Sequence, residues 1–212
     1  MSDKIHIVQV GLNKSTEYAF LLDSANRETK RGKHPLPLNW DRLGLARNDA
    51  RIEYHGIEPN PVSYQALIDK IGIPKQHNFY NLAISDTNGD IEIYDYLKRH
   101  GKSKDKEAKI KTPSRTLETF FREAGIDRCH LLVMDIQGWE YDALRAYKGN
   151  IPIEFAIIEF HAKKNRYTRK KYPHSCDIET FERLIAEKGF AVTSRYVSNS
   201  GVTYDYHLEQ VL

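Results

Sequence analysis

The sequence contains few cysteines and no long apolar run, and these two absences exclude several classes of protein. Cys129 and Cys176 are the only cysteines among 212 residues. They are too few and too far apart for a disulfide framework or a cysteine zinc site. Apolar runs extend over only a handful of residues, so we expect neither a membrane span nor a secretory signal. A reducing, cytoplasmic setting fits this composition best.

Internal repeats and low-complexity tracts are also missing, and the composition is that of a globular protein. Hydrophobic residues make up 40% of the chain and charged residues 29%, which excludes intrinsic disorder. A chain of this length can bury a sizeable core, and we predict a single domain over residues 1–212. Residues 23–49 contain Pro35 and Pro37 and interrupt the pattern of strands and helices, which predicts an insertion.

The net charge of +3 is small, but basic residues are concentrated in two segments. They are KRHGKSKDKEAKIK at residues 98–111 and KKNRYTRKKY at residues 163–172. We therefore predict basic loops at about residues 97–112 and 162–175. Such loops can attract an anionic partner, or they can simply keep the protein soluble, and both interpretations stay open.

Short apolar segments alternate with helical patterns along the chain, which predicts a mostly parallel α/β sheet. Strands are expected at Ile5–Val10, Arg51–Ile57, Asn78–Ile84, Asp90–Tyr96, Cys129–Met134 and Pro152–Phe160. Two final extended runs, Phe190–Val197 and Val202–Val211, predict an antiparallel hairpin at the C-terminal end. The predicted fold has helices on both faces of this sheet.

The stretch LLVMDIQGWEYDAL, from Leu131 to Leu144, predicts a buried strand, a sharp turn and a helix. It places Asp135 at the carboxyl end of the strand, the edge where open α/β sheets bind ligands. Glu58 ends the second strand in the same way, and a carboxylate there can accept hydrogen bonds from both hydroxyls of a ribose. Gly11 ends the first strand, but the dinucleotide pattern G-x-G-x-x-G is absent, and a plain strand-to-helix turn also explains this glycine.

Six segments in a fixed order resemble one enzyme family. They are VQVGLNKSTEYAF, IEPNPVSYQAL, NLAISDTNGDIEIY, SRTLETFF, LLVMDIQGWEYDALRA and IEFAIIEFH, and they span most of residues 7–161. In these segments the chain is similar to class I S-adenosylmethionine-dependent methyltransferases of the FkbM type. The resemblance implies a Rossmann-like sheet of seven strands that encloses S-adenosyl-L-methionine. It also implies methylation of hydroxyl groups, often on sugars or on glycosylated or polyketide natural products.

The resemblance further implies which residues bind the cofactor. Gly11 and Asn13 match the loop that lies against the amino acid moiety. Glu58 matches the acid that binds the ribose, and Asn60 lies just beyond it.

Further along the chain, Leu82 and Ala83 fall where the family places the adenine. Asp135 and Glu140 match the first and last acids of the family stretch D-x-E-G-x-E. For Glu140 we favour a simpler role, in which its charge stabilises the first turn of a helix.

Three positions depart from the family pattern. Gln9 stands where the family usually has an acid beside the ammonium group of the cofactor, Ser15 replaces a second glycine, and Gln137 replaces the middle glutamate. Gln9 can still accept a hydrogen bond from an ammonium, although without the full charge of a carboxylate. These departures therefore predict weaker cofactor binding. A catalytically inactive protein remains an alternative interpretation.

Methylation of a hydroxyl requires a group that takes the hydroxyl proton. His161 is our candidate base, because it follows the fifth predicted strand and histidine titrates near neutral pH; a polar surface role is the alternative. Asp135 and Glu159 end adjacent predicted strands, so they can hold a divalent cation such as Mg²⁺, or orient His161. Two carboxylates and a histidine are too unspecific to name the metal.

The leading hypothesis is an O-methyltransferase that acts on a sugar of a glycan, glycolipid or glycosylated metabolite, for example a deoxyhexose such as rhamnose. In this hypothesis the two basic loops bind the acceptor. One alternative is methylation of a lipid or small secondary metabolite. Another is an inactive binding module whose basic loops dock on an anionic partner, although we do not expect nucleic acid. Further domains of a longer multidomain chain remain candidate partners.

Overall fold

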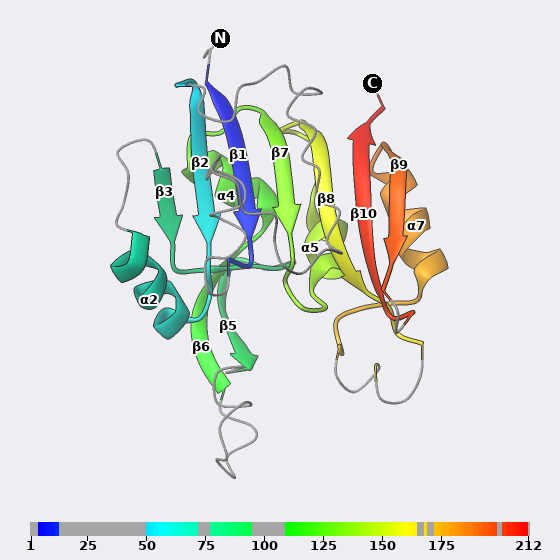
Figure 1. The fold of residues 1–212 in the computed structure, drawn as a ribbon, viewed down its shortest axis with the longest axis horizontal. Coiled ribbons are helices and arrows are strands. Elements are labelled where there is room, and N and C mark those ends of the chain that lie inside the picture. The colour runs from blue at the N-terminus through cyan, green and yellow to red at the C-terminus, as the bar shows by residue number, and fades with distance from the viewer. Residues whose placement is uncertain are drawn as a thin grey trace.

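Seven strands form the central sheet of the protein (Figure 1). The computed structural model describes residues 4–12, 50–71, 77–94, 109–164, 168, 172–198 and 201–211. The seven strands are β1 (Ile5–Val10), β2 (Ile52–Ile57), β3 (His77–Tyr80), β7 (Cys129–Met134), β8 (Ile153–His161), β9 (Phe190–Val197) and β10 (Thr203–Gln210). Their order is β3-β2-β1-β7-β8-β10-β9. The first five pair in parallel, and β10 runs antiparallel to both β8 and β9, which confirms the predicted sheet and hairpin.

A smaller sheet of three strands differs from the sequence-based expectation. It contains β4 (Ala83–Ile84), β5 (Gly89–Tyr94) and β6 (Lys109–Arg115), in the order β4-β6-β5. The expected strand Asn78–Ile84 is therefore split, because β3 joins the large sheet and β4 pairs with β6.

The predicted basic loop at residues 97–112 is also wrong at its end, where residues 109–112 belong to β6. This strand pairs antiparallel with β5, which places acids opposite its lysines. Lys109 Nζ lies 2.8 Å from Glu92 Oε2, and Lys111 Nζ lies 2.8 Å from Asp90 Oδ2. These cross-strand pairs balance the basic charge that made the segment resemble a solvated loop.

Helices cover both faces of the central sheet. They are α2 (Pro61–Ile71), α4 (Leu117–Glu123), α5 (Glu140–Ala146) and α7 (Ile178–Glu187). In Figure 1, α4, α5 and α7 lie behind the sheet. Polar residues cap the starts of α4 and α7, since Thr116 accepts a hydrogen bond from Thr119 N and Asp177 accepts one from Thr180 N. These caps explain why the two helices start where they do.

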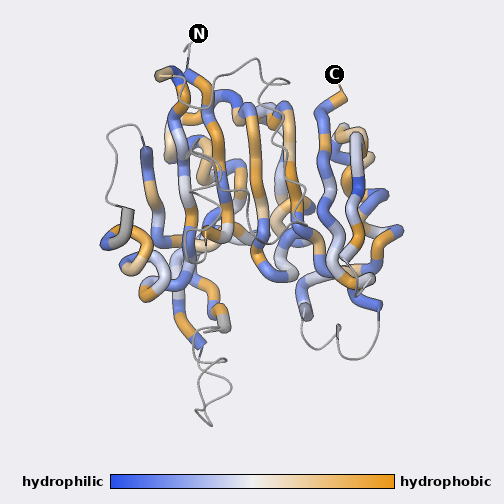
Figure 2. Tube along the Cα trace, in the orientation of Figure 1, coloured by the Kyte–Doolittle hydropathy of each residue, from blue (hydrophilic) through white to orange (hydrophobic). Residues whose placement is uncertain are grey.

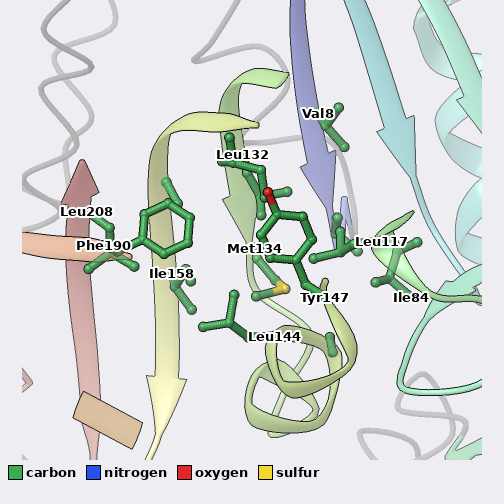
Figure 3. Packing of buried hydrophobic residues seen from close by; sticks show 14 of the residues in the cluster. Val8, Ile84, Leu117, Leu132, Met134, Leu144, Tyr147, Ile158, Phe190 and Leu208 are labelled. Carbon is green, nitrogen blue, oxygen red and sulfur yellow. The ribbon is translucent and has the colours of Figure 1, made fainter. Parts of the chain in front are cut away.

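Two apolar clusters form the core, one on each face of the sheet. Val8 of β1 belongs to the cluster that packs against α4, α5 and α7, whereas Ile7 belongs to the cluster that includes Leu67 of α2. This alternation is expected for a strand buried on both faces, and Figure 2 shows the apolar residues concentrated along the central strands. Figure 3 shows Met134 of β7 close to Leu144 of α5.

Several predicted features lie outside the described residues. They are Asn13, Ser15, the insertion at residues 23–49, the basic segment at residues 97–108 and most of residues 165–171. In the part of the chain that the structure does describe, no helix has the length and apolar character of a membrane span.

The contact between α7 and β8 gives a direct test of the core. Phe181 of α7 is fully buried, and its ring stacks on Phe160 of β8 with ring centroids 3.9 Å apart. Phe181→Ala leaves a cavity at this contact, so we expect the free energy of unfolding to fall by about 3–5 kcal/mol in urea denaturation. Phe181→Leu keeps most of the side-chain volume, so it should lower the free energy of unfolding by clearly less than Phe181→Ala. Equal stabilities of the wild type and Phe181→Ala would contradict the packing.

Candidate functional site

The carboxyl ends of β1, β2 and β7 are held together by backbone contacts. Gly11 N donates to Ile57 O at 2.9 Å, and Asp135 N donates to Val10 O at 3.0 Å. Gly11 has a φ of +89°, and a β-carbon at this position would overlap the carbonyl oxygen of Asp135. Both the backbone conformation and the close approach therefore require glycine. The first cofactor motif thus lies directly against the segment that carries Asp135.

Glu58 directly follows β2 and is buried at the same edge. Its Oε1 accepts a hydrogen bond from Asn60 N at 2.9 Å. The side chain of Asn60 caps α2, because its Oδ1 accepts from Val62 N at 2.9 Å. These bonds fix the predicted ribose carboxylate at the end of the strand, whereas the side chain of Asn60 serves the helix.

Leu82 and Ala83, the residues predicted to contact adenine, directly follow Asn81, whose side chain contacts the backbone of Glu58. Ala83 begins β4 and is buried, and Leu82 packs against the core. Asn81 connects them to the ribose corner, since its Nδ2 donates to Glu58 O at 2.8 Å. Sequence analysis missed Asn81, because an amide after a strand is too common a signal by itself.

Gln9 is buried in β1, and its Oε1 accepts a hydrogen bond from Tyr54 OH at 2.6 Å. Tyr54 lies on the neighbouring strand β2. This hydroxyl donor satisfies a buried amide carbonyl. The pairing gives Gln9 a structural role in addition to the predicted contact with the cofactor.

Asp135, Glu159 and His161 come together at the carboxyl edge of the sheet. One ligand atom from each of the three lies within 4.8 Å of the others, and His161 Nε2 is 3.3 Å from Glu159 Oε1. His161 is the last residue of β8 and is buried, so the expectation that it follows the strand is wrong, as is the surface alternative. Glu159, two residues earlier in β8, points to the same side of the sheet.

Gln137, the departure inside the central stretch, contacts Asp135 directly. Its Nε2 donates a hydrogen bond to Asp135 Oδ1 at 2.7 Å. It is also the only non-glycine residue with a positive φ in the described part of the chain, at 54°. A glutamate there would bring a second negative charge close to Asp135, whereas the amide supplies a neutral donor. The substitution therefore supports the orientation of Asp135.

Glu140 is fully buried at the start of α5 and holds the turn that precedes it. Its Oε1 accepts from Ile136 N at 3.0 Å, and both of its oxygens accept from Gly138 N at 3.0 Å. Burial, together with the nearby charge of Asp135, raises the pKa of Glu140 to about 8. The carboxyl group therefore stabilises the backbone of the turn that precedes α5. Because a pKa of about 8 leaves it uncharged at neutral pH, it does not supply the negative charge that the predicted helix-dipole role requires.

Aromatic side chains border the cluster on the side of α5. The ring of Tyr172 lies 4.4 Å from that of His161, measured between centroids. Trp139 stacks on His174 with centroids 3.5 Å apart, and His174 Nδ1 is 3.2 Å from Asp142 Oδ2. The sequence did not predict the pair of His174 and Asp142. Helical periodicity at Asp142 and the basic composition around His174 gave no signal that they meet.

The donor set of Asp135, Glu159 and His161 fits a divalent cation. Carboxylates suit Mg²⁺ or Mn²⁺, and the imidazole suits a transition metal. Asp205 of β10 lies opposite Glu159 in the antiparallel register, so it faces the same side and adds a carboxylate close to this edge. Nothing in the sequence indicated that Asp205, in a C-terminal hairpin, would lie near this cluster.

The buried Glu140 predicts a specific dependence of stability on pH. Its pKa is about 8 in the folded state, against 4.5 for an ordinary glutamate, so the folded state binds this proton more tightly than the unfolded state. Its contribution to stability is therefore present below about pH 4.5 and is lost as the pH rises through about 8. The difference in unfolding free energy between Glu140→Gln and the wild type should change by on the order of 1 kcal/mol per pH unit across this range.

Urea denaturation of metal-free protein at several pH values measures this difference. Glu179→Gln serves as the control, because Glu179 is an exposed acid in the first turn of α7. Its stability should follow that of the wild type. A Glu140→Gln curve parallel to the wild type would contradict the raised pKa.

Structural comparison places this arrangement among methyltransferase folds. Fibrillarin from Aeropyrum pernix, in complex with S-adenosyl-L-methionine, superposes with a TM-score of 0.52 and 8% identity, over 98% of this chain and 68% of fibrillarin. The N-methyltransferase NodS from Bradyrhizobium japonicum gives 0.51 and 7% identity, over 98% of this chain and 86% of NodS. The CurJ carbon methyltransferase gives 0.53 and 10% identity, over 99% and 50% of the two chains. At such low identity these similarities establish the fold alone.

Sequence comparison is more specific. Among curated proteins, none matches this sequence significantly. The profile of the methyltransferase FkbM domain matches residues 9–190, a range that includes Gly11, Glu58 and the Asp135 cluster. The chain therefore belongs to the FkbM family of methyltransferases.

Proposed function

We propose that this protein is an S-adenosylmethionine-dependent O-methyltransferase that acts on a sugar hydroxyl. The observation that carries the proposal is the buried histidine His161, paired with Glu159 at the edge of the sheet that holds the cofactor motifs. A sugar hydroxyl must lose a proton as its oxygen attacks a methyl group, so its methylation requires a base at the reacting oxygen.

The fold positions a set of groups that suits the cofactor. Glu58 would accept hydrogen bonds from the ribose hydroxyls, and Leu82 and Ala83 would line the adenine site. Gly11 and Gln9 would lie against the amino acid end, together with Asn13. When bound, S-adenosylmethionine supplies an electrophilic methyl group on a sulfonium. A buried carboxylate beside a small apolar residue fits the ribose and base of such a nucleoside.

The proton of the acceptor hydroxyl would pass to the pair of His161 and Glu159. In the neutral ring, Nε2–H donates toward Glu159 Oε1 at 3.3 Å, so the pair shares one proton before the reaction and holds two after it. The positive charge that develops on the ring is offset by this carboxylate. The other ring nitrogen, Nδ1, lies 4.0 Å from Glu140 Oε1, so the ring is held between two carboxyl groups.

The surroundings of His161 favour a sugar over a lipid acceptor. Trp139 and His174 supply flat ring surfaces, and Asp142 and Asp135 add carboxylates that accept hydrogen bonds from hydroxyls. A lipid acceptor would require an apolar wall, whereas the described residues around His161 combine aromatic rings with charged groups. Mg²⁺ bound by Asp135 and Glu159 would lower the pKa of the same hydroxyl and assist the base.

The acceptor is tested by incubating the protein with labelled S-adenosylmethionine and a panel of glycans and glycosylated metabolites. We expect label on a sugar oxygen. His161→Asn should lower kcat by about 10²- to 10⁴-fold and leave the Kd for S-adenosylhomocysteine unchanged. His77→Asn, at the start of β3 on the opposite edge, should retain full activity. Transfer of label only to amines, carbon or nucleic acid would exclude a sugar hydroxyl as the acceptor.

The cofactor site is tested by calorimetric titration with S-adenosylhomocysteine. Glu58→Gln loses the charge that binds two hydroxyls, and hydrogen bonds to charged groups contribute about 1.5–3 kcal/mol. We therefore expect Kd to rise by at least about tenfold. Glu92→Gln, on β5 and paired with Lys109, is the control and should bind normally. No binding to the wild type, together with salt-dependent association with polyanions, would instead support the inactive binding module.

A further inference from the structure

A second group of histidines lies at the opposite edge of the sheet, where β1, β2 and β7 begin (upper edge in Figure 1). His6 of β1 pairs in register with Glu53 of β2, and its backbone N–H donates to His130 Nδ1 at 3.1 Å. His55 follows Glu53 by two residues, so both point to the same face. This group, His6, Glu53 and His55, plays no part in the proposed methyl transfer.

The three side chains converge closely. His6 Nδ1 lies 3.2 Å from His55 Nε2, and His55 Nε2 lies 4.0 Å from Glu53 Oε1. One ligand atom from each residue lies within 4.8 Å of the others. Ligands at about 2.0–2.1 Å from a tetrahedral zinc ion are roughly 3.3 Å apart. The two imidazoles already have this spacing, and the Glu53 carboxylate reaches it by a movement of ~1 Å.

A second shell of hydrogen bonds orients these groups. Tyr80 OH is 3.2 Å from His55 Nδ1, which fixes the ring so that Nε2 faces His6. Asn78 Nδ2 donates to Glu53 Oε1 at 3.1 Å. Metal-binding histidines in proteins are held in this way through their second ring nitrogen. The spacing of the two rings suits a hydrogen bond between them as well as two ligands of one ion, and Lys4 and Asn78 hold Glu53 beside them.

Both rings are available as neutral ligands. His6 and His55 are both buried, and burial disfavours the charged form of an imidazole. Neutral imidazole carries the lone pair that a metal ion needs. Two neutral rings and one carboxylate give a net charge of −1, which favours a divalent cation.

The site also has an access route. Glu53 is 22% exposed, and its Oε2 lies 2.6 Å from Lys4 Nζ, whose side chain is 61% exposed. Ion pairs formed by exposed lysines contribute little to stability. Lys4 can therefore release the Glu53 carboxylate to an entering metal ion. From the other side, the ring of Phe120 in α4 covers His55.

We propose that His6, Glu53 and His55 form a zinc site that joins β1 to β2 at the edge of the sheet opposite the catalytic cluster. Two imidazoles and one carboxylate suit Zn²⁺ rather than Mg²⁺, which prefers oxygen ligands alone. The exposed side of Glu53 leaves the fourth position to water. The bound ion joins two strands and therefore stabilises the folded chain.

Cobalt and zinc titrations of the full chain test this site. The double variant Asp135→Asn, Glu159→Gln is used as the background, because it removes the carboxylates of the catalytic cluster. After treatment with a chelator, we expect one equivalent of Co²⁺ to give the visible spectrum of a tetrahedral site. Zn²⁺ should displace this cobalt and raise Tm. Absence of a one-to-one cobalt spectrum, or no effect of Zn²⁺ on it, would overturn the proposal.

Variants assign the binding to these residues. Glu53→Gln, at a partly exposed position, should weaken Zn²⁺ binding by at least about tenfold. Glu154→Gln serves as the control, since Glu154 pairs with Arg128 at the same edge of the sheet and should bind normally. Unchanged affinity in Glu53→Gln, or an equal loss in both variants, would contradict the assignment.

Variants of His6 or His55 can fail to fold, because both rings are buried. Nitrogen NMR of the histidine rings in the folded protein therefore tests their role without substituting them. Addition of Zn²⁺ to the same background should shift Nδ1 of His6 and Nε2 of His55. A shift confined to other histidines, or no shift, would overturn the site.

Discussion

The close approach of two strand ends is the constraint on which the candidate site depends. Gly11, at the end of β1, lies so near the backbone of Asp135 that no side chain fits between them. The backbone bond from Asp135 N to Val10 O holds the same contact. Because the two ends cannot separate, the loop that matches the first cofactor motif and the segment that carries Asp135 form one surface. The positions of Glu159 and His161 follow from the pairing of β8 with β7.

Buried carboxyl groups give this surface its electrostatic character. Glu140 holds the turn from Ile136 to Gly138 through hydrogen bonds to its backbone, while Asp135 and Glu159 lie beside His161. Close acids would repel one another if all were charged, and the high pKa of Glu140 relieves part of this repulsion. Gln137 acts in the same direction, because its amide donates to Asp135 where a carboxylate would repel it. The departure from the family pattern therefore has a local physical reason.

Much of the fold was predictable from the sequence, because β1, β7 and β8 are apolar runs with clear ends and their order leaves few topologies. Glu58 and Asp135 were predictable as edge residues for the same reason. The small sheet was not, since Lys109 and Lys111 resemble a solvated loop until acids on β5 are known to face them. Long-range contacts of this kind have no local signal.

The detailed contacts of the site also depend on such long-range pairing. The burial of His161 results from its inclusion in β8 and from the ring of Tyr172, and local sequence indicated neither. The central claim is that one edge of the sheet holds the cofactor with its reactive end toward His161. A crystal structure with S-adenosylhomocysteine tests it most directly. We predict the ribose at Glu58, the adenine beside Ala83 and the sulfur facing Asp135 and His161. A product molecule bound away from these residues would contradict the account.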